Sequence, residues 1–171
     1  MRDSLSTHPW WDYVHEDLRE LLIQSSLLID IFTQKKESQK LDEKNKFHDW
    51  AFIVFPAAKA YEGYLKTLFR DLKFISDEDF YGKRFRIGRA LNPELDRNFR
   101  EKESVYDRLV NYCKGPKLAD TLWETWKRGR NLLFHWFPNE RNAISFSEAK
   151  DMVDRILSTM DLAFESCKLE A

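Results

Sequence analysis

One short segment of the chain combines residue types that can bind a phosphate group and transfer a proton. Its sequence is Arg128-Gly129-Arg130-Asn131-Leu132-Leu133-Phe134-His135. An imidazole changes its charge near neutral pH and can act as a general acid or base. Guanidinium groups hold phosphate oxygens and stabilise the charge that develops on them. Together with Asn131, which can orient the imidazole or a ribose, these groups suit RNA cleavage without a metal ion. In that reaction the 2′-hydroxyl attacks the phosphodiester and leaves a 2′,3′-cyclic phosphate.

The spacing of these residues predicts how a helix would present them. Arg128, Asn131 and His135 stand at i, i+3 and i+7, so a helix places them on one face, with Arg130 off that face but able to reach it. A single histidine does not supply both a base and a separate acid. A two-fold dimer that brings two copies of His135 to one cleft would supply both. The alternative is that His135 is a core histidine packed beside tryptophans.

Two charged residues occupy positions where the helical pattern calls for apolar ones. Arg130 lies on the apolar stripe of its segment, and Glu62 lies on the stripe that contains Leu65 and Phe69. A buried charge needs a partner, and a guanidinium suits a carboxylate. We therefore expect Glu62 to bind Arg130 across a helix interface, with Lys66 sharing the carboxylate. The alternative is an ion pair that only fixes the register of the helices.

A basic stretch between residues 80 and 100 is the third candidate feature. It reads FYGKRFRIGRALNPELDRNFR, with aromatic residues between its cations. Cations for phosphates and aromatic rings for base stacking are what single-stranded RNA binding requires. We therefore expect Lys83, Arg84, Arg86 and Arg89 to contact RNA. The alternative is a solvated loop anchored by its aromatic side chains.

Periodic apolar residues predict that helices position these groups. The expected helices cover about 9–33, 45–73, 86–91, 102–113 and 117–137, followed by a last helix that begins after Ser145 or Ser147. Pro9 is expected in the first turn after a capping Ser6 or Thr7, and Pro56 is expected to kink the second helix or to mark a restart. Lysine-rich residues 33–46 connect the first two helices. The prediction is an all-α bundle of four to five helices.

Composition limits the class of protein. The chain has 171 residues, 43% of them hydrophobic, 33% charged and 15% aromatic, with a net charge of −1. These values predict one globular domain over residues 1–171 without a global field for nucleic acid, so an RNA site must be a local patch. Cys113 and Cys167 have no zinc or disulfide spacing, and no signal peptide or membrane segment is apparent. We expect a cytoplasmic protein that needs no cofactor, metal or membrane.

The chain also resembles a known family of helical ribonucleases. The segment RNLLFH matches the R-x4-6-H motif of the HEPN superfamily, and AYEGYLK, residues 60–66, resembles the acidic helix that accompanies it. The wider pattern FPAAKAYEGYLKTLF, IGRALNP and RGRNLLFHW resembles the C-terminal HEPN domain of RnlA/LsoA-type RNase LS toxins, over roughly residues 45–165. The chain is too short to hold the domains that precede it in those toxins. A free-standing toxin or antiviral defence effector is therefore expected.

The resemblance implies a homodimer with facing Arg130–His135 motifs and a ribonuclease held in check by a cognate antitoxin protein. Two other functions stay open. One is a non-catalytic HEPN module for dimerisation or nucleotide binding, in which Arg128 and Arg130 bind a phosphate and His135 is structural. The other is an interaction subunit whose first helix contacts a basic partner through four acidic residues: Asp12, Glu16, Asp17 and Glu20.

Overall fold

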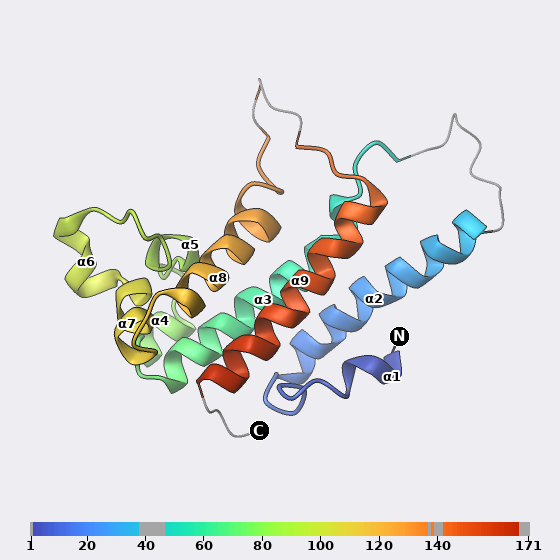
Figure 1. The fold of residues 1–171 in the computed structure, drawn as a ribbon. Coiled ribbons are helices and arrows are strands. Elements are labelled where there is room, and N and C mark those ends of the chain that lie inside the picture. Colours follow the sequence, from blue (N-terminus) through green and yellow to red (C-terminus); the bar gives the residue numbers. More distant parts are fainter. Residues whose placement is uncertain (1, 38–46, 137, 139–141, 168–171) are drawn as a thin grey trace.

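The chain is built from helices and connecting turns. The computed structural model describes residues 2–37, 47–136, 138 and 142–167, and no strand occurs within these ranges (Figure 1). The all-α prediction is confirmed. The predicted connector falls largely on residues 38–46, which, like residue 137 at the expected end of the fourth helix, lie outside the described ranges.

Four helices form the body of the molecule: α2 (Glu16–Glu37), α3 (Ala51–Asp71), α8 (Lys117–Trp126) and α9 (Phe146–Ser166). They alternate in direction along the chain, and α3 packs against both α2 and α9, while α8 packs against α9 (Figure 1). Their facing sides share aliphatic residues at helical spacing. The buried set includes Leu22, Ile29, Leu65, Leu68, Leu122, Ile156 and Met160.

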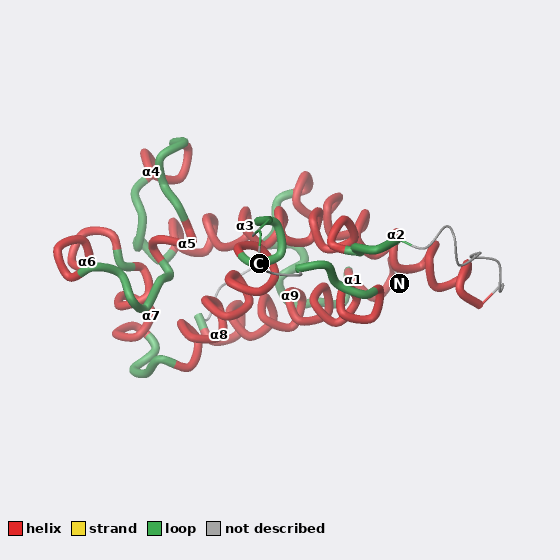
Figure 2. Tube along the Cα trace, turned by 90° about the horizontal axis from the view of Figure 1, so that it is seen from above, coloured by secondary structure: helices red, strands yellow, loops and turns green. Residues whose placement is uncertain are grey.

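Short helices cover one end of this body. They are α4 (Asp77–Tyr81), α5 (Ile87–Ala90), α6 (Arg97–Glu103) and α7 (Val105–Tyr112). Figure 2 shows them grouped at the end opposite the far tip of α2. The short helix α5 was expected, whereas α4 and α6 were not. The expected helix over 102–113 is shorter, because Ser104 ends α6 and caps α7 by accepting a hydrogen bond from the Asp107 amide at 3.0 Å.

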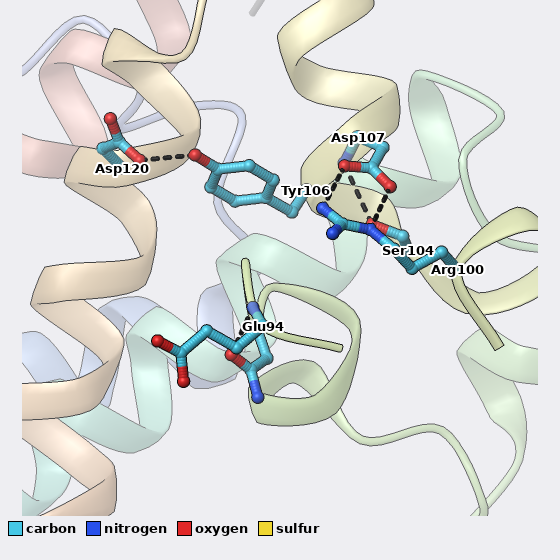
Figure 3. A network of polar contacts seen from close by, with 7 residues as sticks. Glu94, Arg100, Ser104, Tyr106, Asp107 and Asp120 are labelled. Atoms are coloured by element: carbon cyan, nitrogen blue, oxygen red, sulfur yellow. Dashed lines mark hydrogen bonds and ion pairs between the residues drawn. The ribbon is translucent and has the colours of Figure 1, made fainter. Parts of the chain in front are cut away.

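A polar network joins α6, α7 and α8 (Figure 3). Arg100 on α6 donates two hydrogen bonds to the Asp107 carboxylate, at 2.9 and 2.8 Å. This paired donation holds the pKa of Asp107 below its usual value. Tyr106 donates to Asp120 on α8 at 2.6 Å, and this bond, with some burial, raises the pKa of Tyr106 to about 12. The short helices are therefore fixed to the body by directed contacts as well as by apolar packing.

The first helix differs from the prediction. It begins at Glu16 rather than at Pro9, and residues 6–13 form turns after the short helix α1 (Arg2–Leu5). Thr7 does not cap a helix here; its hydroxyl donates to the Ser4 carbonyl at 2.7 Å. Trp10 is fully buried. The apolar residues of this segment follow helical spacing because they are buried against the core, not because the backbone is helical.

Pro56 neither ends nor restarts α3. The residue after it, Ala57, donates its amide to the Ser25 hydroxyl at 2.9 Å, and that hydroxyl donates to the Ile53 carbonyl at 2.8 Å. The fully buried Ser25 of α2 thus bridges an amide and a carbonyl four residues apart on α3, next to the proline that removes one helical donor. A side chain of the neighbouring helix thus binds the backbone on both sides of the proline, and α3 runs through it.

The last helix confirms its predicted start. The Ser145 hydroxyl accepts from the Glu148 amide, and the Glu148 carboxylate accepts from the Ser145 amide at 2.8 Å. This is the capping box that the sequence indicates, and it satisfies backbone donors that α9 leaves open at its first turn.

Candidate functional site

The segment with the R-x4-H spacing begins in an unusual turn. After α8 the chain winds into a π-helical segment, η2 (Lys127–Asn131), in which the Leu132 amide donates to the Lys127 carbonyl, five residues back, at 2.8 Å. Gly129 lies in its centre and is buried against α9, where an added Cβ would stand 3.2 Å from the Met152 sulfur. Wider turns of this kind are rare and are frequently found at functional sites. The lack of a side chain at Gly129 lets η2 approach α9 closely.

The helix ends at Asn131 and does not reach residue 137 as expected. Residues 132–134 form a turn, and His135 follows in a non-helical stretch where its side chain is exposed. The i, i+3, i+7 argument for a shared helical face is therefore wrong, and so is the alternative that His135 is buried in the core. The Asn142 amide donates to the carbonyls of Leu132, at 3.3 Å, and His135, at 3.0 Å. This side chain holds the turn in place.

Arg130 and Glu62 form the ion pair that the sequence predicts. The distance from Arg130 Nη2 to Glu62 Oε2 is 3.4 Å, and each side chain is 36% exposed. The pair is made through one nitrogen–oxygen contact and lies at the surface, so the expected burial on the core face is not found. The guanidinium also lies beside the rings of Trp126 and Phe134, 6.0 and 5.8 Å from their centroids. Arg130 is thus held by a carboxylate and two aromatic rings while part of it stays open to solvent.

A cleft of about 510 Å³ opens beside this pair, between α3, η2 and the 82–89 segment. We call it the motif cleft. It brings together eight of the ten side chains that the sequence proposes for a site, from three separate parts of the chain. They are Arg130, Asn131 and His135; Glu62 and Lys66; and Lys83, Arg86 and Arg89.

The motif cleft is positively charged although the whole chain is not. Its described lining contains five cationic side chains and one carboxylate, against a net charge of −1 for the chain. Glu62 is partly neutralised by Arg130, and Arg89 is paired with Glu103 at 3.2 Å outside the lining. Lys66 and Lys83 form no ion pair with a carboxylate of the described residues. A concave surface of one charge sign concentrates counter-ions, so this cleft favours an anionic ligand.

Two proposed residues lie outside the motif cleft. Arg128 lines a separate groove beside α9 and pairs with Glu124, with 3.4 Å between Nε and Oε2. The π-helical turn and the following bend separate it from Asn131 and His135, so it does not share their face. Arg84 lines a neighbouring cavity on the other side of the 85–89 segment. Arg84 is not among the residues that line the motif cleft, although its neighbours Lys83 and Phe85 are.

Five of the described cleft residues were not named as site residues from the sequence: Gly82, Phe85, Ile87, Gly88 and Trp126. Trp126 was assigned to the apolar stripe, yet its nearly buried ring forms part of the cleft wall. Gly88 lies against that ring, where a Cβ would stand 2.7 Å from Trp126 Nε1. Phe85 supplies a half-exposed aromatic side chain. The mixture of aromatic residues and cations in the basic stretch was a sequence signal for Phe85, whereas Trp126 lies outside that stretch.

Comparisons of the chain with protein-family models, curated proteins and solved structures gave no match. Among the described helices, none has the length and apolar character needed to cross a bilayer. Within the same described ranges, no three His, Cys, Asp or Glu side chains converge as the ligands of a metal ion would.

Proposed function

We propose that this chain is an endoribonuclease of HEPN type that needs no metal ion. The observation that carries the proposal is the convergence of Arg130, Asn131 and His135 with the basic segment in the motif cleft. An anionic substrate fits the charge of that cleft. The imidazole supplies a group that can exchange a proton near neutral pH. The residues that would cleave RNA therefore line a concave surface that is open to solvent.

The proposed reaction is transfer of the phosphoryl group within the RNA strand. His135 takes the proton from the 2′-hydroxyl, the 2′-oxygen forms a bond to phosphorus, and the bond from phosphorus to the 5′-oxygen breaks. The leaving 5′-oxygen takes up a proton, and the products are a 2′,3′-cyclic phosphate and a 5′-hydroxyl. Arg130 stabilises the charge that builds up on the phosphate oxygens, and Glu62 holds its guanidinium in position. Proton transfer by a positioned side chain contributes about 10²–10⁴-fold.

We further propose that two copies act together. One imidazole serves as base, and a second copy of His135 across a two-fold axis supplies the proton for the leaving group. Exposed apolar side chains beside the motif suit such an interface: Trp136 is 83% exposed, and Leu132 and Phe55 are 40% and 50% exposed. Light scattering should give twice the chain mass at concentrations where the protein cleaves RNA. Full activity from a monomer would contradict this part of the proposal.

Cleavage of RNA in the presence of EDTA tests the central proposal. We expect wild-type protein to produce 2′,3′-cyclic phosphate ends and His135→Ala to lose at least about 10²-fold in rate. His48→Ala is the matched control, because His48 is also exposed and lines neither the motif cleft nor the neighbouring cavity that Arg84 lines. Equal cleavage by wild type and His135→Ala would remove His135 from the reaction.

The biological role that we propose, a toxin or antiviral defence effector acting in the cytoplasm, rests on the family resemblance. Induced expression in a bacterial host should arrest growth for wild type and not for His135→Ala. Relief of that arrest by a co-expressed partner would identify the antitoxin. The alternative of a non-catalytic nucleotide-binding module predicts tight binding of RNA or nucleotide with no turnover by the dimer.

A further inference from the structure

A second basic cavity adjoins the motif cleft. Its volume is about 420 Å³, and its lining includes Arg84, Lys102 and Arg108. It lies between the 84–90 segment, the end of α6 and the start of α7, next to the turn that follows α3. Arg108 binds the cavity wall, because its guanidinium donates hydrogen bonds to the main-chain carbonyls of Phe74 and of Lys102, the latter at 2.9 Å. Its donors are therefore used within the protein.

The two hollows share one wall. Phe85, Arg86 and Arg89 line both of them. Arg86 is fixed at this boundary, since its guanidinium donates to the carbonyls of Lys83 and Phe85. The motif cleft and the second cavity are therefore two parts of one basic track that passes over the 85–89 segment.

Of the two described carboxylates that line the second cavity, Glu103 is paired with a cation and Asp79 is held by hydrogen bonds. Glu103 pairs with Arg89, and Asp79 accepts a hydrogen bond from the Ser76 hydroxyl at 3.0 Å within the capping box of α4. By contrast, Arg84 and Lys102 are exposed and form no ion pair with any described carboxylate. The described lining as a whole holds five cationic side chains against two carboxylates, so the second cavity has an excess of positive charge.

We propose that the second cavity binds a backbone phosphate of a nucleotide next to the scissile one. This inference rests on the proposed function of the motif cleft. A single RNA strand would place its scissile phosphodiester beside Arg130 and its flanking phosphate between Arg84 and Lys102. Phe85, in the shared wall, offers a ring on which an unpaired base can stack. The substrate class is therefore single-stranded RNA that extends beyond one phosphodiester, since paired bases would not be available for stacking.

Binding to strands of different length tests this subsite separately from cleavage. The probes are fluorescent 2′-O-methyl RNAs, which keep the phosphates but lack the attacking hydroxyl: a dinucleotide with a single phosphodiester and a strand of about 12 nucleotides. Arg84→Ala and Lys102→Ala should each weaken binding of the longer strand about fivefold, and each lost phosphate contact should reduce the salt slope of log K by about 0.7. Dinucleotide affinity should change less than about twofold.

Lys117→Ala is the matched control, because Lys117 is an exposed lysine that lines neither cavity. It should leave the affinity and the salt slope of both probes unchanged. Unaltered binding of the longer strand by Arg84→Ala and Lys102→Ala would overturn the proposal. Equal weakening of both probes would also overturn it, because that pattern indicates a general field effect. Polyglutamate of equal charge tests the alternative of an acidic protein partner. That alternative is favoured if polyglutamate displaces the RNA from the wild-type protein and no longer binds to Arg84→Ala and Lys102→Ala.

The proposed nuclease and the proposed subsite can fail independently. If wild type and His135→Ala cleave equally, the function fails while the length-dependent binding still decides the subsite. If His135→Ala abolishes cleavage but Arg84→Ala and Lys102→Ala bind the longer strand like wild type, the proposed nuclease function is supported and the proposed subsite is refuted.

Discussion

The ion pair between Arg130 and Glu62 gives the sharpest test of the site geometry. A double-mutant cycle with Glu62→Gln, Arg130→Gln and the double variant isolates the coupling energy between the two side chains. At the observed 3.4 Å, two unit charges attract by about 1 kcal/mol in water and about 5 kcal/mol at an effective dielectric constant of 20. Each side chain is 36% exposed and only one nitrogen–oxygen contact is made. The value of about 1 kcal/mol for water therefore applies. The conformational entropy lost when both side chains are held in one geometry offsets part of this attraction.

We expect a coupling energy of about 0.5–1 kcal/mol, measured by urea unfolding of the four proteins. Each single variant should stay folded, so that RNA cleavage by the same proteins reports on the site rather than on the fold. Cleavage should fall about 10²-fold for Arg130→Gln, as on removal of one group that stabilises transition-state charge. It should fall less for Glu62→Gln, which keeps the guanidinium but loosens it. A coupling energy above about 2 kcal/mol, or unfolding of either single variant, would refute the exposed geometry and favour the buried pair expected from the sequence.

Three further predictions concern the fold and the wall of the motif cleft. Ser25→Ala removes the hydroxyl that bridges two backbone groups beside the helix proline, and should lower the free energy of unfolding by about 1–3 kcal/mol in urea titrations; a change below about 0.5 kcal/mol would contradict the bridge. The pKa of Tyr106 is raised to about 12 from an ordinary 10.0, so the stability from its bond to Asp120 is complete below pH 10 and is lost as the pH rises toward 12. The melting-temperature difference between wild type and Tyr106→Phe should therefore shrink between pH 10 and pH 12. A difference that stays constant over this interval would contradict a stabilising bond from Tyr106 to Asp120. Gly88→Ala places a Cβ 2.7 Å from Trp126 Nε1, so it should shift the tryptophan fluorescence and reduce cleavage, whereas an unchanged spectrum would show that the wall adapts freely.

Local patterns in the sequence predicted several features correctly. The capping box at Ser145 and Glu148 was predictable because both partners lie within one turn of the chain. The pairing of Glu62 with Arg130 followed from two charges on apolar faces of helices that must pack together. The motif and the basic stretch were each proposed for an RNA site from their chemistry, but the sequence did not predict that they meet in the motif cleft.

Other features depended on contacts between distant segments. Residues 6–13 have helical spacing of apolar residues, but the buried Trp10 is reached through turns. The helix carrying the motif was expected to run to residue 137, but it widens at η2 and ends at Asn131, where Gly129 contacts α9 and Asn142 holds the following turn. No pattern within the motif indicates either contact.

By itself the sequence determined the helical class, the pairing of the two charges and the residue types that a ribonuclease site would need. Helix periodicity and capping act over a few residues, so they can be read from neighbouring positions. Only the tertiary structure decided that His135 leaves the helix, that Arg128 and Arg84 line other hollows than the motif cleft, and that Trp126 forms part of the cleft wall. These outcomes depend on packing between segments far apart in the chain, and that packing overrides the local preferences of each segment.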